Sequence, residues 1–213
     1  MSWKVTVLVA LMLGASVVIG RELGPETATW DSTRAAGWVA YLLLWAAVFS
    51  GVGVDLRFHP GVGRQQVVLE LHRMSGTLGI AFVLAHGLAL TLDRYVAFDP
   101  WDIVVPLTSD YRPVPVALGV VALWLTAAIL VSTWVSARIP RTAWRSIHLL
   151  AYPAYVLALL HGLLAGSDTE HWPTHVIYSL TAGAILGAAF LRSVARDWVA
   201  AARGRAGSQS PAR

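Results

Sequence analysis

Apolar and polar positions fall into long blocks along the chain, in which nearly charge-free runs are separated by connectors that carry the charges. The runs cover residues 5–20, 35–54, 74–92, 113–137, 146–167 and 171–191. A helix that crosses the hydrocarbon layer of a bilayer needs about 20 apolar residues, a length that every run except the first reaches. The pattern predicts an all-α membrane protein built as a bundle of six transmembrane helices. The short first run also fits the apolar region of a signal peptide.

Composition removes several functional classes. The 213 residues are 56% hydrophobic and 13% charged, whereas globular chains are about 25% charged, so a sizeable soluble domain is not expected. We expect membrane lipid, and no nucleic acid, around the chain. The absence of cysteine excludes disulfides, thiolate-ligated haem, cysteine-bound iron–sulfur clusters and c-type haem attachment. Histidine is the soft metal ligand that remains.

The connectors alternate in charge, and this alternation predicts the orientation. Twelve of the 16 basic residues lie before the first run, in alternate connectors and in the C-terminal tail: Lys4, Arg57, Arg64, Arg73, Arg138, Arg141, Arg145, Arg192, Arg196, Arg203, Arg205 and Arg213. The positive-inside rule places these segments, and both termini, in the cytoplasm. We expect a multi-pass plasma-membrane protein with a transmembrane domain at residues 1–195 and a disordered basic cytoplasmic tail at 196–213.

Two of the apolar segments each carry a pair of histidines. His72 precedes His86 by 14 residues and His148 precedes His161 by 13, which is about 21 and 20 Å along a helix. The predicted third and fifth helices run in the same direction, so His72 would lie level with His148 near the cytoplasm and His86 level with His161 near the outer face. Paired histidines inside a membrane indicate a functional site, and these pairs fit two six-coordinate b-type haems.

Helical phase argues against a shared face for His148 and His161, and the other three histidines are not expected to bind iron. Thirteen residues leave His161 about 140° away from His148 on a straight helix, unless Pro153 kinks it. His59 is expected in a loop, and His171 and His175 are expected at an interface rather than on iron. A proton or metal-ion transporter that uses the intramembrane histidines is the alternative from another functional class.

Two segments around these histidines carry a resemblance to a known family. The segment 71–76, Leu-His-Arg-Met-Ser-Gly, and the segment 144–153, Trp-Arg-Ser-Ile-His-Leu-Leu-Ala-Tyr-Pro, resemble the ferric reductase-like transmembrane domain proteins. The resemblance implies a six-helix haem unit in which His72 pairs with His148 and His86 pairs with His161. The chain is also similar to the haem-binding membrane subunit of the bacterial periplasmic methionine sulfoxide reductase system, and this second resemblance implies, as an alternative, a role as the membrane anchor of such an enzyme.

Electron supply and haem contacts complete the prediction. The chain has no G-x-G-x-x-G pattern for nucleotide binding, so we expect a separate flavin reductase, quinol, or a flavin without a recognisable motif as the donor. Arg73 and Arg145 could pair with carboxylates of an inner haem, and Arg112 with those of an outer haem or with an anionic substrate. The connector at 93–113 is expected either to cover the outer haem edge as a lid or to form a short interfacial helix.

Overall fold

The computed structural model describes residues 3–25, 27–56, 62–94, 96 and 98–208, and places side chains at 7–25, 27–54, 65–94, 96 and 98–194. All regular elements in this part of the chain are helical. Their bounds are α1 Trp3–Leu23, α2 Ala28–Leu56, α3 Val62–Leu92, α4 Pro100–Val104, α5 Pro113–Trp134, α6 Arg141–His148, α7 Ala151–Ala165, the 3₁₀ turn η1 Ser167–Glu170, and α8 Trp172–Ser208. His59 lies outside the described residues.

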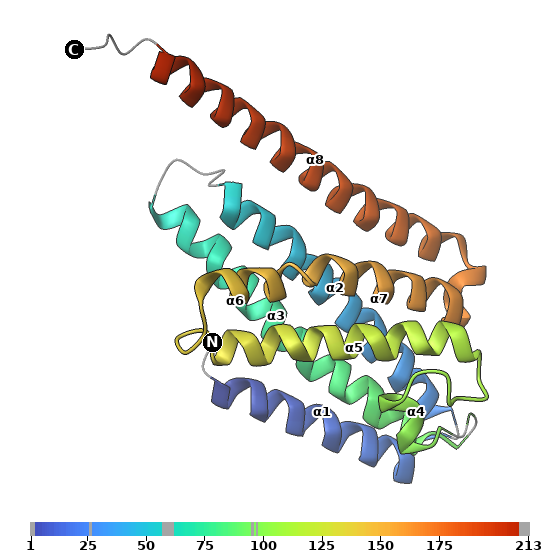
Figure 1. The fold of residues 1–213 in the computed structure, drawn as a ribbon. Helices are drawn as coiled ribbons and strands as arrows, with labels where there is room; N and C mark the ends of the chain where they lie inside the picture. Colours follow the sequence, from blue (N-terminus) through green and yellow to red (C-terminus); the bar gives the residue numbers. More distant parts are fainter. Residues whose placement is uncertain (1–2, 26, 57–61, 95, 97, 209–213) are drawn as a thin grey trace.

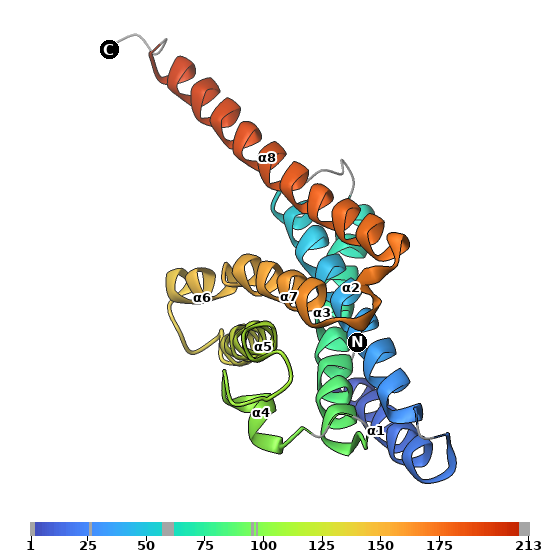
Figure 2. The same cartoon turned by 90° about the vertical axis from the view of Figure 1, so that its right-hand side faces the viewer.

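The helices form two groups around a central space. Helices α2 and α3 pack against each other as an antiparallel hairpin, and α1 packs on α3. Helix α5 packs on α7, and α2 contacts both α7 and α8. Figure 2 shows α5, α6 and α7 on one side of the molecule and α1, α2 and α3 on the other. The two groups therefore lie side by side, and α2 joins them through its contacts with α7.

Five helical segments are long and apolar enough to cross a membrane. They are Ala28–Val54, Gln65–Leu92, Pro113–Trp134, Arg141–Ala165 and Trp172–Val194. The all-helical class is confirmed, as are five of the six expected spans by length and composition. The first apolar run forms α1 but is not among the five, so its role as a sixth span or as a signal peptide stays a prediction. Helix α8 runs across the expected domain boundary at residue 195 to Ser208.

The fourth of these segments is interrupted, and its sequence explains why. Helix α6 ends at His148 and α7 begins at Ala151. Pro153 has no N–H to give to the carbonyl four residues before it, at Leu149. That carbonyl instead accepts from the Tyr152 N–H at 3.2 Å, in a tighter turn. The interruption expected at Pro153 is confirmed.

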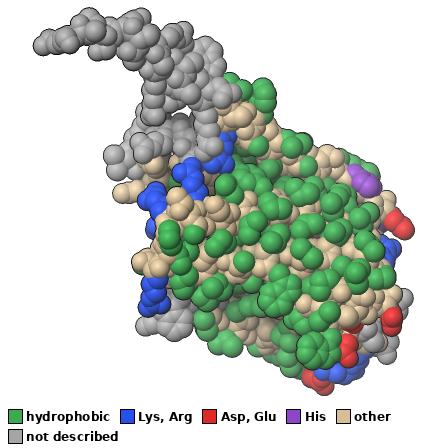
Figure 3. Space-filling model, viewed as in Figure 1, with side chains coloured by type: hydrophobic (Ala, Val, Ile, Leu, Met, Phe, Trp, Pro, Cys, Tyr) green, Lys and Arg blue, Asp and Glu red, His purple; other side chains and the backbone are tan. Residues whose placement is uncertain are grey.

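Charges gather at opposite ends of the helices. Figure 3 shows Lys and Arg side chains without acidic neighbours at the end where α5 leads into α6, and Asp and Glu side chains together with a few Lys or Arg side chains around the end that carries α4. We call the first the basic end, defined by Arg73, Arg138, Arg141 and Arg145, and the second the acidic end, defined by Asp93, Asp99, Asp102, Asp110 and Asp168. Apolar side chains cover the surface between them, as a lipid-facing surface requires.

A tyrosine cluster closes the core between α2, α7 and α8. Tyr155 is 2% exposed and packs with Tyr41 and Tyr178. The Tyr41 hydroxyl lies 3.1 Å from that of Tyr155 and 2.5 Å from that of Thr181. Hydroxyl groups in an apolar interior need such partners, so these contacts fix how the two helical groups meet.

Candidate functional site

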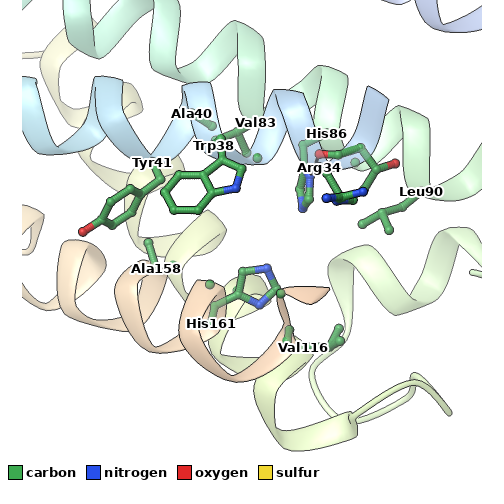
Figure 4. Close-up of a pocket in the computed structure, with 18 of the residues that line it drawn as sticks. Arg34, Trp38, Ala40, Tyr41, Val83, His86, Leu90, Val116, Ala158 and His161 are labelled. Atoms are coloured by element: carbon green, nitrogen blue, oxygen red, sulfur yellow. Dashed lines mark hydrogen bonds between the residues drawn. The ribbon is translucent and has the colours of Figure 1, made fainter. Parts of the chain in front are cut away.

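The four predicted histidines lie in two pairs, one near each end of the bundle. His72 on α3 faces His148 at the end of α6, with ring centroids 5.8 Å apart. His86 on α3 faces His161 on α7, with ring centroids 6.2 Å apart. Figure 4 shows the His86 and His161 rings turned toward each other across a pocket. The structure therefore brings together the residues that the sequence predicted to pair. We call His72 and His148 the basic-end pair, and His86 and His161 the acidic-end pair.

Three of the rings are anchored through the same nitrogen. The Nδ1 atoms of His72, His86 and His161 lie 2.8, 2.9 and 2.9 Å from the carbonyl oxygens of Ala47, Thr33 and Pro115. A carbonyl oxygen can only accept, so each Nδ1 carries the proton and donates it. In a neutral ring, Nε2 then keeps its lone pair free, the state in which histidine binds metals.

A glycine lies beside each anchored ring. Gly37, Gly51 and Gly119 each follow, by four residues, the residue whose carbonyl accepts from the ring. A Cβ atom would lie 3.1 Å from His86 Nδ1 at Gly37, 3.2 Å from His72 Cε1 at Gly51, and 2.7 Å from His161 Nδ1 at Gly119. A side chain at Gly119 would displace the imidazole, and one at Gly37 or Gly51 would push its ring by a few tenths of an ångström. We call each set of carbonyl, glycine and ring a histidine cradle.

Sequence reasoning did not find the three glycines. A signal was present, because Gly37 and Gly51 are separated by 14 residues, the same spacing that separates His72 from His86. On two antiparallel helices, equal spacings let Gly37 lie beside His86 while Gly51 lies beside His72.

His148 is held differently. Its Nδ1 is buried without a hydrogen-bond partner. Its ring stacks on the Trp144 indole instead, with centroids 4.9 Å apart and planes inclined by 24°. Trp144 precedes it by one helical turn on α6, so the two side chains share a face.

A cavity surrounds the acidic-end pair. Its volume is about 230 Å³, slightly below the ~300–1,000 Å³ of ordinary small-molecule pockets. Apolar and aromatic side chains from α2, α5 and α7 line most of it, including Trp38, Tyr41 and Val120. The cavity thus offers two imidazoles a mostly apolar chamber, with polar side chains such as Arg34 and Asp168 in part of its lining.

The connector at 93–113 takes part in this cavity. Phe98 and Ile103 line it, and Phe98 is buried against Val116 and Val120 of α5. The connector also forms α4, whose capping box joins Asp99 and Asp102. The short helix expected in this connector is therefore present as α4 and brings Ile103 to the cavity, whereas the connector's role as a lid over a haem edge stays a prediction.

Part of the chain that holds three of the four histidines matches a known protein family. Residues 35–159 match the family described as ferric reductase like transmembrane component. The chain belongs to this family. The match includes His72, His86 and His148 and ends two residues before His161. Comparisons with curated proteins and with solved structures gave no match.

Family membership fixes the general role. This ferric reductase-like component is a multi-pass membrane protein, and its membership implies electron transfer in a membrane. Within the described residues, no group of three or more His, Cys, Asp or Glu side chains gathers to hold a bare metal ion. Any metal at either pair would therefore need most of its ligands from another source.

The predicted arginines occupy different places. Arg73 and Arg145 are exposed at the basic end, on α3 and α6. Arg112 is exposed and donates to the Leu164 carbonyl at 2.8 Å, and it is not among the residues that line the cavity. The arginine that does line the cavity is Arg34, which sequence reasoning missed because one charge near a helix start is common at a membrane interface.

Arg34 belongs to a polar group at the cavity mouth. Its guanidinium pairs with Asp168 of η1 and, at 3.3 Å, with Asp31. The Trp38 indole N–H donates to Asp168 at 3.0 Å. Burial raises the pKa of the Asp168 carboxyl, but the bonds from Arg34 and Trp38 outweigh it, so the pKa lies below its ordinary value. Nearby, Thr33 Oγ1 is buried without a partner and lines the cavity.

His171 and His175, at the start of α8, are both exposed and neither joins a pair. This placement agrees with the interfacial role expected for them.

Proposed function

We propose that this ferric reductase-like component carries electrons across the plasma membrane through two b-type haems, one at each histidine pair. The observation that carries the proposal is the set of three histidine cradles, in which a backbone carbonyl binds Nδ1 and leaves Nε2 for a metal. Second-shell bonds of this kind orient histidine ligands and raise their basicity.

The donor set favours haem over a bare ion. Two imidazoles are too few ligands for zinc or copper, and no third ligand of the His, Cys, Asp or Glu type lies with them among the described side chains. Haem iron, which has four porphyrin nitrogens, would need only two further ligands from the protein, and the two histidines of each pair would provide them. When bound, each haem iron would accept and release one electron.

The chain's residues would set the surroundings of these groups. At the acidic end, the apolar cavity walls would exclude water from the ring faces. The Arg34 guanidinium, in a fork geometry suited to carboxylates, and the Thr33 hydroxyl would hold the haem carboxylates. The pairs are separated by 14 residues on α3, about 21 Å along the helix, so each lies near one membrane face.

Haem stoichiometry tests the ligand assignment. The pyridine haemochrome should give two haems per chain for the native protein. His72→Ala and His148→Ala should each lose the basic-end haem, and His86→Ala and His161→Ala the acidic-end haem. The control His175→Ala, at an exposed residue of α8, should keep both. A protein without a Soret band after haem supplementation would exclude this function and favour the transporter, and two haems in all four variants would refute the ligand set.

Electron entry is proposed at the basic end, from a separate flavin reductase or from quinol. Arg138 and Arg141 are exposed there and could steer an acidic partner surface. Arg138→Gln combined with Arg141→Gln should slow haem reduction by a flavin reductase and weaken its salt dependence. Reduction by dithionite, which needs no docking, should not change. Equal slowing of both reactions would contradict docking at these arginines.

A further inference from the structure

His148 differs from the other three histidines in its hydrogen bonding. The Nδ1 atoms of His72, His86 and His161 each meet a carbonyl oxygen, whereas His148 Nδ1 is buried and has no partner. A bond from Nδ1–H strengthens a histidine as a ligand, and its loss typically costs 10–100-fold in metal affinity. His148 would therefore be the weakest ligand of the four.

The position of His148 in the fold points the same way. It is the last residue of α6, an eight-residue helix without a buried residue, and the helix is interrupted immediately after it. His72, its partner, lies within the 31-residue helix α3 and packs beside Gly51. The chain can move around His148 at little cost in packing, but not around His72.

Stacking on Trp144 is the contact that orients the His148 ring. A stacked indole fixes the plane of an imidazole but supplies no acceptor for its N–H. The ring can therefore rotate or withdraw along the indole face without breaking a hydrogen bond.

We propose that the basic-end iron is a binding site for a small neutral π-acceptor gas, with carbon monoxide as the test ligand, and that His148 is the ligand it displaces. This inference rests on the proposed haem function. With reduced haem bound, His148 would give up its bond through Nε2 and keep the electron pair on the imidazole, while the gas would supply a pair from carbon. The iron would stay ferrous and no proton would move. His72 would remain a ligand, and both histidines of the acidic-end pair would stay in place.

Carbon monoxide titration of the dithionite-reduced protein tests the inference. After the haemochrome confirms two haems, carbon monoxide should shift the Soret band of half of the haem. His86→Ala with His161→Ala should leave one haem that binds the gas. His72→Ala with His148→Ala should leave one haem that does not. An absent adduct in a two-haem protein, or an adduct on the acidic-end haem, would overturn the inference, whereas a protein without haem would overturn the proposed function itself.

A tryptophan comparison tests the mechanism in a protein that keeps all four histidines. Trp144→Ala removes the stacking contact and should raise carbon monoxide affinity by about tenfold, the lower range for second-shell losses. Trp134→Ala, at a residue 73% exposed at the same end of the molecule, should leave the affinity unchanged. Equal affinities in the two variants would show that Trp144 does not hold His148 in place.

Discussion

Gly37, Gly51 and Gly119 lie against imidazole rings from neighbouring helices, and each leaves the space that a side chain would take. In each cradle the ring also donates to a backbone carbonyl that lies four residues before the glycine, on the helix that carries the glycine. At the residue scale, glycine is thus needed at these three positions because the histidine ring occupies the space of a side chain.

Gly119→Ala should disrupt the acidic-end pair. The added Cβ would lie 2.7 Å from His161 Nδ1, so the ring must move and its bond to Pro115 must lengthen. We expect loss of the acidic-end haem, measured as one haem per chain. Gly183→Ala is the control, since a Cβ there meets nothing within 4 Å and alanine favours a helix by up to about 1 kcal/mol. Two haems in both variants would show that the cradle is not required.

Asp168 should make stability depend on pH. Its folded pKa lies below the ordinary value, so its contribution is present above an unfolded pKa of about 3.9 and is lost as pH falls through the folded value. Asp168→Asn should therefore lower the thermal midpoint in detergent at pH 7. Because the Arg34 side chain is 40% exposed, screening limits the cost to about 1 kcal/mol. The difference between the two proteins should shrink toward pH 3, and a constant difference would contradict the ion pair.

At the scale of elements, the interruption between α6 and α7 decides which way two histidines face. On one straight helix, His148 and His161 would point about 140° apart. The break at residues 149 and 150, caused by Pro153, lets both rings face α3.

Pro153→Ala should rejoin the two helices. Alanine restores an N–H for the Leu149 carbonyl and removes the ring that prevents a regular helix. We expect His148 to turn away from His72 and the basic-end haem to be lost, as measured by haem content. Pro173→Ala, in the first turn of α8 where an N–H has no helical partner, should keep both haems. Full haem content in Pro153→Ala would show that the break does not aim His148.

The sequence revealed the histidine pairs and the break because both depend on features along one helix, namely rise per residue and the chemistry of proline. The cradles depend on how α2 and α3 are aligned, which a single sequence does not reveal. The polar group around Arg34 was missed for a similar reason, since its pairing with Asp168 of η1 joins segments far apart in the sequence. The expected role of Arg112 in the outer site stays a prediction. Its guanidinium donates to the Leu164 carbonyl at the end of α7, and it does not line the cavity.

At the scale of the whole molecule, the separation of charge gives a testable orientation. The connector after α5 lies at the basic end and the connector after α4 at the acidic end. The positive-inside rule places the basic end in the cytoplasm. The chain has no cysteine, so a single introduced thiol reports its side of the membrane without background.

Thr108→Cys and Ser136→Cys should label from opposite sides. Both residues are exposed, and neither change removes a charge that could alter the topology. In intact cells a membrane-impermeant maleimide should react with the thiol at 108 and not with that at 136. After lysis both should react. The reverse pattern would invert the orientation, and labelling of both thiols in intact cells would contradict a membrane between them.

The alignment of α2 with α3 has a consequence for what the chain can tolerate over evolutionary time. Gly37 and Gly51 of α2 contact two rings that both belong to α3. These two contacts fix the alignment of α2 along α3. One inserted residue between 37 and 51, or between 72 and 86, would turn the following part of its helix by about 100° and advance it by about 1.5 Å. Insertions and deletions should therefore accumulate in the connectors, while the two 14-residue intervals keep their length.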